Sequence, residues 1–235
     1  MKTILMTLAV IAVMAPLAAD ALEVSVQVGG EAMIVPSKGY DPFSQNDNLG
    51  AGSLALGVRP FGRGPLRGLG FELGYAGGTA GDRLWSTFDA NLTLNMLNVG
   101  ASYRWGRFDW FAPYVRLLGT VAWGDVQITK GMYGDLDDHA TAFGGSLALG
   151  FELCTPRAWL RPDDEENTAW WRPASLGVYL EGGYGKYGAL SFSRAGAAPI
   201  TADDVHKTVY DVAGPALGSL DLSGPTIRAG FVANF

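Results

Sequence analysis

The strongest structural signal in this chain is its final stretch, Thr226-Ile227-Arg228-Ala229-Gly230-Phe231-Val232-Ala233-Asn234-Phe235. Every second residue from Ile227 to Phe235 is apolar or small, and the residues between them are polar or glycine, with Val232 as the exception. Because side chains of a β-strand alternate between its two faces, this period of two predicts a strand with one apolar face. We therefore expect an amphipathic strand that finishes on an aromatic residue.

The opposite end of the chain has a different pattern. Lys2 supplies a positive start, an apolar segment runs from Ile4 to about Ala15, and Ala19 and Ala21 are small residues on either side of Asp20. These are the three parts of a secretory signal peptide. The apolar segment is shorter than the roughly 20 residues that a membrane-spanning helix needs. We expect residues 1–21 to be a cleaved signal peptide and residues 22–235 to form the folded domain.

The period of two recurs along the whole region between these ends. It predicts strands at about 22–34, 49–60, 69–79, 87–105, 110–124, 141–154, 174–187 and from about 216 to the end. Within 87–105 the apolar set changes parity once, from Phe88, Ala90, Leu92 and Leu94 to Val99, Ala101, Tyr103 and Trp105. A single parity slip inside a strand predicts a β-bulge.

The composition narrows the class of protein. Hydrophobic residues reach 48%, yet no segment after residue 21 approaches about 18 continuous apolar residues, so no helix is expected to span a membrane. A lipid-facing β-barrel has this composition because its hydrophobicity is spread over alternate positions. A soluble β-sandwich is the alternative, but it would have to expose one large apolar face. The net charge of −6 argues against nucleic-acid binding, and the single Cys154 excludes an internal disulfide framework.

We therefore predict an all-β fold, a transmembrane antiparallel up-and-down β-barrel of eight strands. The long connections 155–173 and 188–216 leave ten strands open as an alternative. An even number of strands places both ends of the barrel on the periplasmic side of the membrane. Aromatic residues near strand ends are expected to form the girdles at the membrane surfaces: Trp105, Trp110, Phe111, Trp123, Tyr184 and Phe235.

The inward face of the predicted barrel carries both signs of charge. Eight strands leave an interior only wide enough for side chains, and an unpaired buried charge is costly, so we expect these charges to pair. If hairpin-linked strands supply the partners, the pairs are Glu23 with Arg59, Glu72 with Arg104, Arg116 with Glu152, and Glu181 with Arg228. This ion-pair network predicts a plugged lumen. A narrow gated pore, or a proton or ion path, is the alternative.

Catalytic and metal sites are weakly supported. Catalysis by a barrel usually needs a histidine held by a carboxylate, and the chain has His139 and His206, both expected in extracellular loops. His206 lies near Asp203, Asp204 and Asp211, but a solvated loop is favoured, so we predict no catalytic residue and no cofactor. Three carboxylates beside His139 are weak candidates for a divalent cation, because their spacing is not that of the twelve-residue calcium loop: Asp135, Asp137 and Asp138.

Residues 22–235 resemble the small outer-membrane barrels of the OmpA/OmpX/OmpW kind, on strand pattern, signal peptide and terminal aromatic rather than on a diagnostic motif. The last strand, ending in Phe235, resembles the signal that the barrel-assembly machinery binds. The resemblance implies an outer-membrane location, contacts with membrane lipid and lipopolysaccharide, and a non-enzymatic structural or surface-interaction role with a partner that the sequence does not name. A small-solute channel or transporter is the alternative, and a lipid-modifying or proteolytic barrel enzyme is the third.

Overall fold

The computed structural model describes residues 22–41, 43–44, 46–61, 64–84, 88–105, 110–129, 135–156, 175–192 and 218–235, without the side chains of residues 84, 88, 135 and 136. These residues form strands and short turns. The strands are β1 (Glu23–Ile34), β2 (Asn48–Arg59), β3 (Leu69–Leu84), β4 (Phe88–Arg104), β5 (Phe111–Thr129), β6 (Asp135–Cys154), β7 (Ser175–Tyr187), β8 (Ala189–Ser191), β9 (Ser219–Asp221) and β10 (Gly224–Asn234). In the described part of the chain, no helix is long and apolar enough to cross a membrane.

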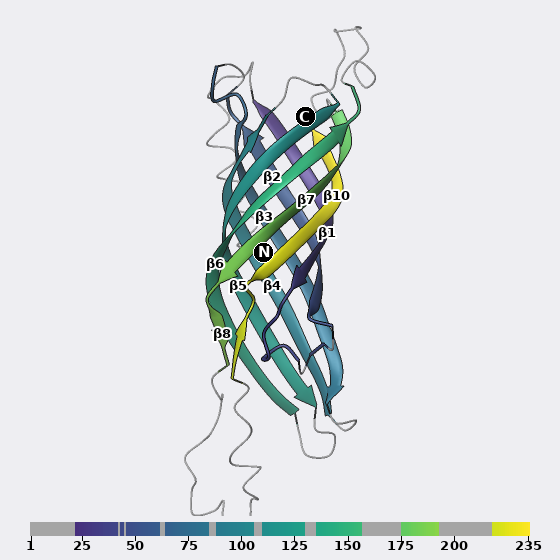
Figure 1. Ribbon diagram of the computed structural model, residues 1–235, viewed down its shortest axis with the longest axis vertical. Helices are drawn as coiled ribbons and strands as arrows, with labels where there is room; N and C mark the ends of the chain where they lie inside the picture. The colour runs from purple at the N-terminus through teal and green to yellow at the C-terminus, as the bar shows by residue number, and fades with distance from the viewer. Residues whose placement is uncertain are drawn as a thin grey trace, which may run out of the picture.

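Eight of these strands close into an antiparallel barrel in the order β1-β10-β7-β6-β5-β4-β3-β2 (Figure 1). Closure is made by β10 against β1, with Val28 opposite Phe231 and Glu31 opposite Arg228. The two remaining strands, β8 and β9, pair with each other in a separate two-stranded sheet that lies beside the lower part of the barrel in Figure 1. The predicted fold, a closed antiparallel barrel of eight strands, is thus confirmed. β8 and β9 do not insert into the barrel wall.

Two parts of the barrel are distinguished below. The terminal half holds the start of β1 and the end of β10. The distal half holds the end of β3, the start of β6 and the β8–β9 sheet. The predicted strand ranges agree with the structure in the terminal half, whereas in the distal half the strands are longer than predicted: β3 continues to Leu84, β5 to Thr129, and β6 begins at Asp135.

The predicted bulge in the fourth strand is wrong. β4 pairs with β3 and with β5 in unbroken register over its whole length. Its buried residues keep a strict period of two through Leu92, Leu94, Met96 and Asn98, while Leu97 and other residues of opposite parity face outward. What changes near Met96 is the chemistry of each face, because the apolar residues move from the inner to the outer face. A parity slip in hydrophobicity can therefore mark a change of surroundings as well as a bulge.

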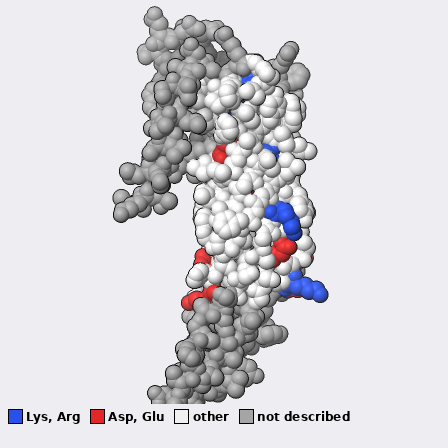
Figure 2. Space-filling view, turned by 90° about the vertical axis from the view of Figure 1, so that its left-hand side faces the viewer, with Lys and Arg blue, Asp and Glu red and all other residues white. Residues whose placement is uncertain are grey.

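The outer wall of the terminal half is apolar. Large side chains stand out from it, with Phe231, Phe143 and Leu149 exposed by 72%, 70% and 65%. On the side drawn in Figure 2, the upper part of the wall is almost free of charged residues, and most of the coloured atoms lie lower down, toward the distal half. An apolar surface of this extent is expected for a barrel wall that faces lipid.

Candidate functional site

The lumen of the terminal half is filled by glutamate and arginine side chains from alternate, inward positions of the strands. Four of them form a closed ring in which each arginine contacts both glutamates. Arg59 lies 2.9 Å from Glu23 and 3.7 Å from Glu152, and Arg104 lies 3.1 Å from Glu23 and 3.4 Å from Glu152. With two carboxylates and two guanidinium groups, this ring balances its own charge.

Five further residues form an open chain of ion pairs toward the middle of the barrel. Arg116 Nε contacts Glu72 at 2.9 Å and Arg116 Nη1 contacts Glu181 at 3.0 Å. Arg228 continues the chain from Glu181, at 3.0 Å, to Glu31, at 3.4 Å. This row of ion pairs begins with the carboxylate of Glu72 and ends with that of Glu31. It therefore contains three carboxylates and two guanidinium groups.

Polar side chains join the two groups through further hydrogen bonds. Arg116 Nη2 donates to Gln27 Oε1 at 2.6 Å, and Gln27 Nε2 donates to Glu152 Oε1 at 3.5 Å. The hydroxyl of Tyr114 donates to Glu181 at 2.9 Å. Arg116 and Glu152 are each only 1% exposed. Buried charges of this kind are tolerated when partners surround them, which is the arrangement seen here.

The structure brings the eight predicted lumen residues together, but not in all the predicted pairs. Glu23 contacts Arg59 and Glu181 contacts Arg228, as the pairing of neighbouring strands suggested. The expected pairs of Glu72 with Arg104 and of Arg116 with Glu152 are wrong. Glu72 contacts Arg116, while Arg104 contacts Glu152. Long side chains in a narrow barrel reach across the lumen, so a partner need not come from the strand next in sequence.

The distal half of the lumen is apolar, which the sequence prediction missed. Inward residues of β3 to β6 form its wall, among them Leu92, Leu94, Met96 and Val126, all at most 2% exposed. Residues from outside the barrel strands pack into it and close it: Val35, Tyr40 and Phe43 after β1, Leu190 and Phe192 at β8, and Leu220 and Leu222 at β9. We call these seven residues the lid. The alternation in Ala189–Ser191 and in Ser219–Leu222 was the signal available for it in the sequence.

A glycine makes room for the lid on the barrel wall. A Cβ added to Gly124, on the inward face of β5, would lie 2.9 Å from a methyl carbon of Leu190 and 3.4 Å from the ring of Phe192. Those distances are shorter than ordinary carbon contacts. The lid therefore packs directly on the backbone of β5.

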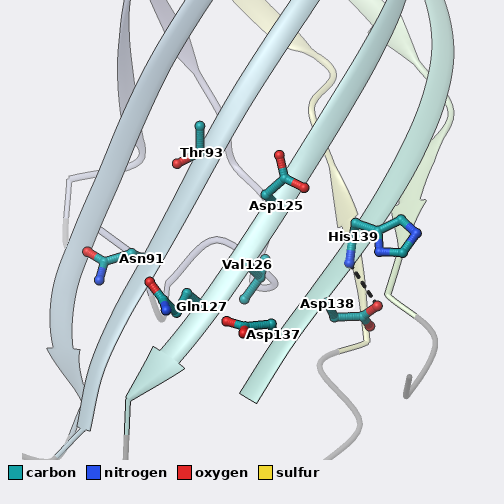
Figure 3. A pocket seen from close by; sticks show the side chains of 8 residues that line it. All are labelled: Asn91, Thr93, Asp125, Val126, Gln127, Asp137, Asp138 and His139. Atoms are coloured by element: carbon teal, nitrogen blue, oxygen red, sulfur yellow. Dashed lines mark hydrogen bonds between the residues drawn. The ribbon is translucent and has the colours of Figure 1, made fainter. Parts of the chain in front are cut away.

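The outer face of the distal half carries a polar pocket of about 390 Å³ between β4, β5 and β6 (Figure 3). Asn91, Thr93, Asp125, Val126, Gln127, Asp137, Asp138 and His139 line it. Asp125 is the direct cross-strand partner of both Thr93 and His139. Asp138 is 8% exposed and accepts a hydrogen bond from the backbone N–H of His139 at 2.8 Å.

The histidine and metal predictions concern this region. His139 was expected in a loop, but it lies within β6 with its side chain exposed, because the strands extend farther than predicted. Among the described residues, no three of histidine, cysteine, aspartate and glutamate are grouped so as to hold a metal ion. The side chain of Asp135, like His206, Asp203, Asp204 and Asp211, lies outside the described part of the structure.

The predicted girdle residues lie at two levels. Trp105, Trp110, Phe111 and Phe235 are at the strand ends of the terminal half, where the backbone N–H of Phe235 donates to Val24 O at 2.8 Å. Trp123 and Tyr184 are at the boundary with the distal half, exposed by 38% and 54%. Cys154 is a free, buried cysteine.

A family model described as "Outer membrane protein beta-barrel domain" matches residues 5–159. Three solved structures are similar to the chain. Ail, the attachment invasion locus protein of Yersinia pestis, solved with the heparin analogue sucrose octasulfate, shares 12% identity (91% of this chain, 99% of Ail, TM-score 0.49). Neisserial surface protein A shares 13% identity, with 93% of this chain and 99% of that protein covered and a TM-score of 0.44. A major outer membrane protein from Thermus thermophilus shares 16% identity, with 90% of this chain and 99% of that protein covered and a TM-score of 0.46. No curated protein matches the sequence.

Proposed function

Because this chain belongs to the outer-membrane protein β-barrel family and is a protein of the outer membrane, we propose that it works as a closed, non-enzymatic barrel with a structural or surface-interaction role. Residues 1–21 direct its export and residues 22–235 form its one domain. The terminal half lies toward the periplasm and the distal half projects outward beyond the lipid. Phe235 is the contact for the assembly machinery.

The observation that carries this proposal is that the lumen is filled at two successive levels. The terminal half contains the network of nine titratable groups, and the distal half contains the apolar cluster sealed by the lid. A solute crossing the barrel would have to break buried ion pairs and then displace Leu190, Phe192, Leu220 and Leu222. Either step alone is costly, because it leaves buried charges or apolar contacts unpartnered.

The surface role is supported by the distal outer wall. Its outward residues on β4 to β6 carry hydrogen-bonding side chains around the pocket of Figure 3. The outward residues of the terminal half, in contrast, include leucine and phenylalanine. The order of residues there also favours a non-enzymatic role. Asp125 lies between Thr93 and His139, whereas a nucleophilic triad needs the histidine in the middle.

The test is conductance of the refolded protein in planar lipid bilayers. We expect no steady channel activity from residues 22–235. Two variants locate the barrier: Leu190→Ser with Leu220→Ser removes apolar contacts of the lid, and Arg116→Ser breaks the terminal network. Arg83→Ser, an exposed residue that pairs with Asp89, is the matched control.

The outcomes separate the alternatives. If the barrel is closed at both levels, neither single-level change produces steady conductance, and only their combination does. Steady conductance of the unmodified protein would overturn the closed-barrel proposal and favour the small-solute channel. Conductance appearing with the lid variant alone would show that the ion-pair network does not block ions.

A further inference from the structure

Among the described residues, the lumen network contains one more carboxylate than guanidinium group. Its carboxylates belong to Glu23, Glu31, Glu72, Glu152 and Glu181, and its guanidinium groups to Arg59, Arg104, Arg116 and Arg228. Within the ring, the contacts of Glu23 and Glu152 join two carboxylates to two guanidinium groups. The excess negative charge therefore belongs to the open chain that runs from Glu72 to Glu31.

Within that row of ion pairs, Glu31 at one end has the weakest contacts. Glu181 touches two guanidinium groups at 3.0 Å and accepts the hydroxyl of Tyr114. Glu72 has Arg116 Nε at 2.9 Å. Glu31 has one ionic contact among the described residues, Arg228 Nε at 3.4 Å, and Arg228 is shared with Glu181 at the shorter distance of 3.0 Å.

The surroundings of Glu31 give an ionised carboxylate little compensation. Its side chain is 8% exposed. The charged and titratable groups that face it are Arg228 on β10, Glu181 and Tyr187 on β7, and Arg116 on β5. A second negative charge on Glu181 opposes ionisation, and an isolated buried carboxylate usually takes up a proton rather than remain charged.

A small cavity lies beside Glu31, at the junction of the ionic and apolar halves. Its volume is about 10 Å³, which is room for one water molecule at most. Its lining is mixed, with Asn98, Ser146 and Thr226 as the uncharged polar members and Met96 and Leu118 among the apolar ones. The space suits a proton, or a proton shared with one water, better than a hydrated ion.

We infer that Glu31 is a proton-binding site that holds its proton at neutral pH, so that four ionised carboxylates face four guanidinium groups among the described residues of the network. The neutral Glu31 removes the net charge that would otherwise draw a cation into the barrel. The inference builds on the proposed closed lumen and specifies how that lumen stays neutral.

Infrared spectroscopy of the protein refolded in phosphatidylcholine vesicles at pH 7 tests this. We expect a carbonyl band of a protonated carboxylic acid that shifts in D₂O and is lost in Glu31→Gln. Asp138→Asn is the matched control, because Asp138 is the other buried carboxyl near the distal half, and it should keep the band. If the unmodified protein lacks the band, or Glu31→Gln retains it, the inference is wrong.

Unfolding by urea gives a second readout. Glutamine replaces a neutral carboxyl group with a neutral amide group of similar shape. Glu31→Gln should therefore leave the unfolding equilibrium constant nearly unchanged. Glu181→Gln, which breaks contacts to two guanidinium groups, should raise that constant about 100-fold or more. An equally large effect of Glu31→Gln would mean that Glu31 is ionised.

The remaining alternative is a bound monovalent cation. In that case the protein would be more stable in sodium chloride than in choline chloride at equal ionic strength, and Glu31→Gln would abolish this difference. That result would overturn protonation of Glu31 in favour of a bound cation. If Glu31→Gln fails to refold, Glu31→Asp should keep a carboxylic acid band at a shifted position. Neither measurement depends on conductance. A leaky barrel would therefore contradict the closed lumen alone, and a missing band would contradict only the proton site.

Discussion

In the terminal half of the barrel the inward residues are charged and the outward residues are apolar, whereas in the distal half the two faces exchange character. β5 shows both arrangements in one strand. Arg116 points in and Leu117 points out near its middle, while Val126 points in and Gln127 points out near its end. The backbone alternates identically in both places. With the proposed placement, lipid around one half and water around the other, the surroundings outside the wall select which chemistry each face carries.

The side chains that fill the two halves are held together by different forces. The ionic half depends on pairing, so the loss of one group leaves its partners as buried unpaired charges. The apolar half depends on packing, so the loss of one group leaves a cavity whose cost grows with its size. Substitutions in the two halves should therefore differ in magnitude and in their dependence on partners.

The largest effect is expected from Arg116→Met. It leaves Glu72 and Glu181 without their shared guanidinium group, and breaking a buried ion pair costs about 3–5 kcal/mol. Tryptophan fluorescence during urea unfolding in lipid vesicles measures it. The control Arg83→Met breaks the exposed pair with Asp89 and should cost about 1 kcal/mol or less. Equal effects of the two would mean that the lumen network is well hydrated.

The distal half is tested by Leu92→Ala. Leu92 is fully buried in the apolar cluster, and its truncation should lower the free energy of unfolding by about 2–5 kcal/mol through lost contacts and a cavity. Leu97→Ala, on the opposite face of the same strand and 41% exposed, should cost clearly less because no cavity forms. If Leu97→Ala proved the more harmful, the assignment of faces in β4 would be reversed.

The boundary between lipid and water on the outer wall can be located with arginine. Leu117→Arg should cost about 2–4 kcal/mol, the value for the middle of the membrane, whereas Gln127→Arg should cost about 0–1 kcal/mol. Both positions face outward on β5, on either side of Trp123. The measurement is again unfolding in vesicles. Similar costs at both positions would contradict the exchange of surroundings along this strand.

The smallest effect concerns the lid. Hydrogen bonding to Ser223, whose backbone N–H donates to Asp221 Oδ1 at 2.9 Å, holds the pKa of Asp221 below its ordinary value. A lowered pKa in the folded state stabilises the lid above the ordinary carboxyl pKa, and this contribution is lost as pH falls through the lowered value. Hydrogen exchange of the Leu220 and Leu222 amides measures it. Asp221→Asn should exchange faster than the unmodified protein at pH 6, with the difference vanishing in acid.

Sequence patterns predicted the terminal half well. The alternation in β10 placed Phe231 on the apolar face and Arg228 in the lumen, as the structure has them. The same rule failed in β4, where the change of parity after Leu94 predicts a bulge but the strand register is unbroken. An alternation of polar and apolar residues shows that a strand has two unlike faces. It does not show what lies against each face. The prediction assumed that lipid covers the outer face along the whole strand. This assumption does not fit the distal half, where the inward residues are apolar.

The amino-acid sequence by itself determined that the chain forms eight long amphipathic strands, because alternation is a local property of the backbone. It also determined which charged residues enter the lumen. The tertiary structure alone decided which carboxylate contacts which arginine, because the stagger and curvature of a closed barrel bring residues from distant strands within reach. It alone decided that the lid closes the distal half, since Leu190 and Gly124 are far apart in sequence and meet only when the barrel is closed.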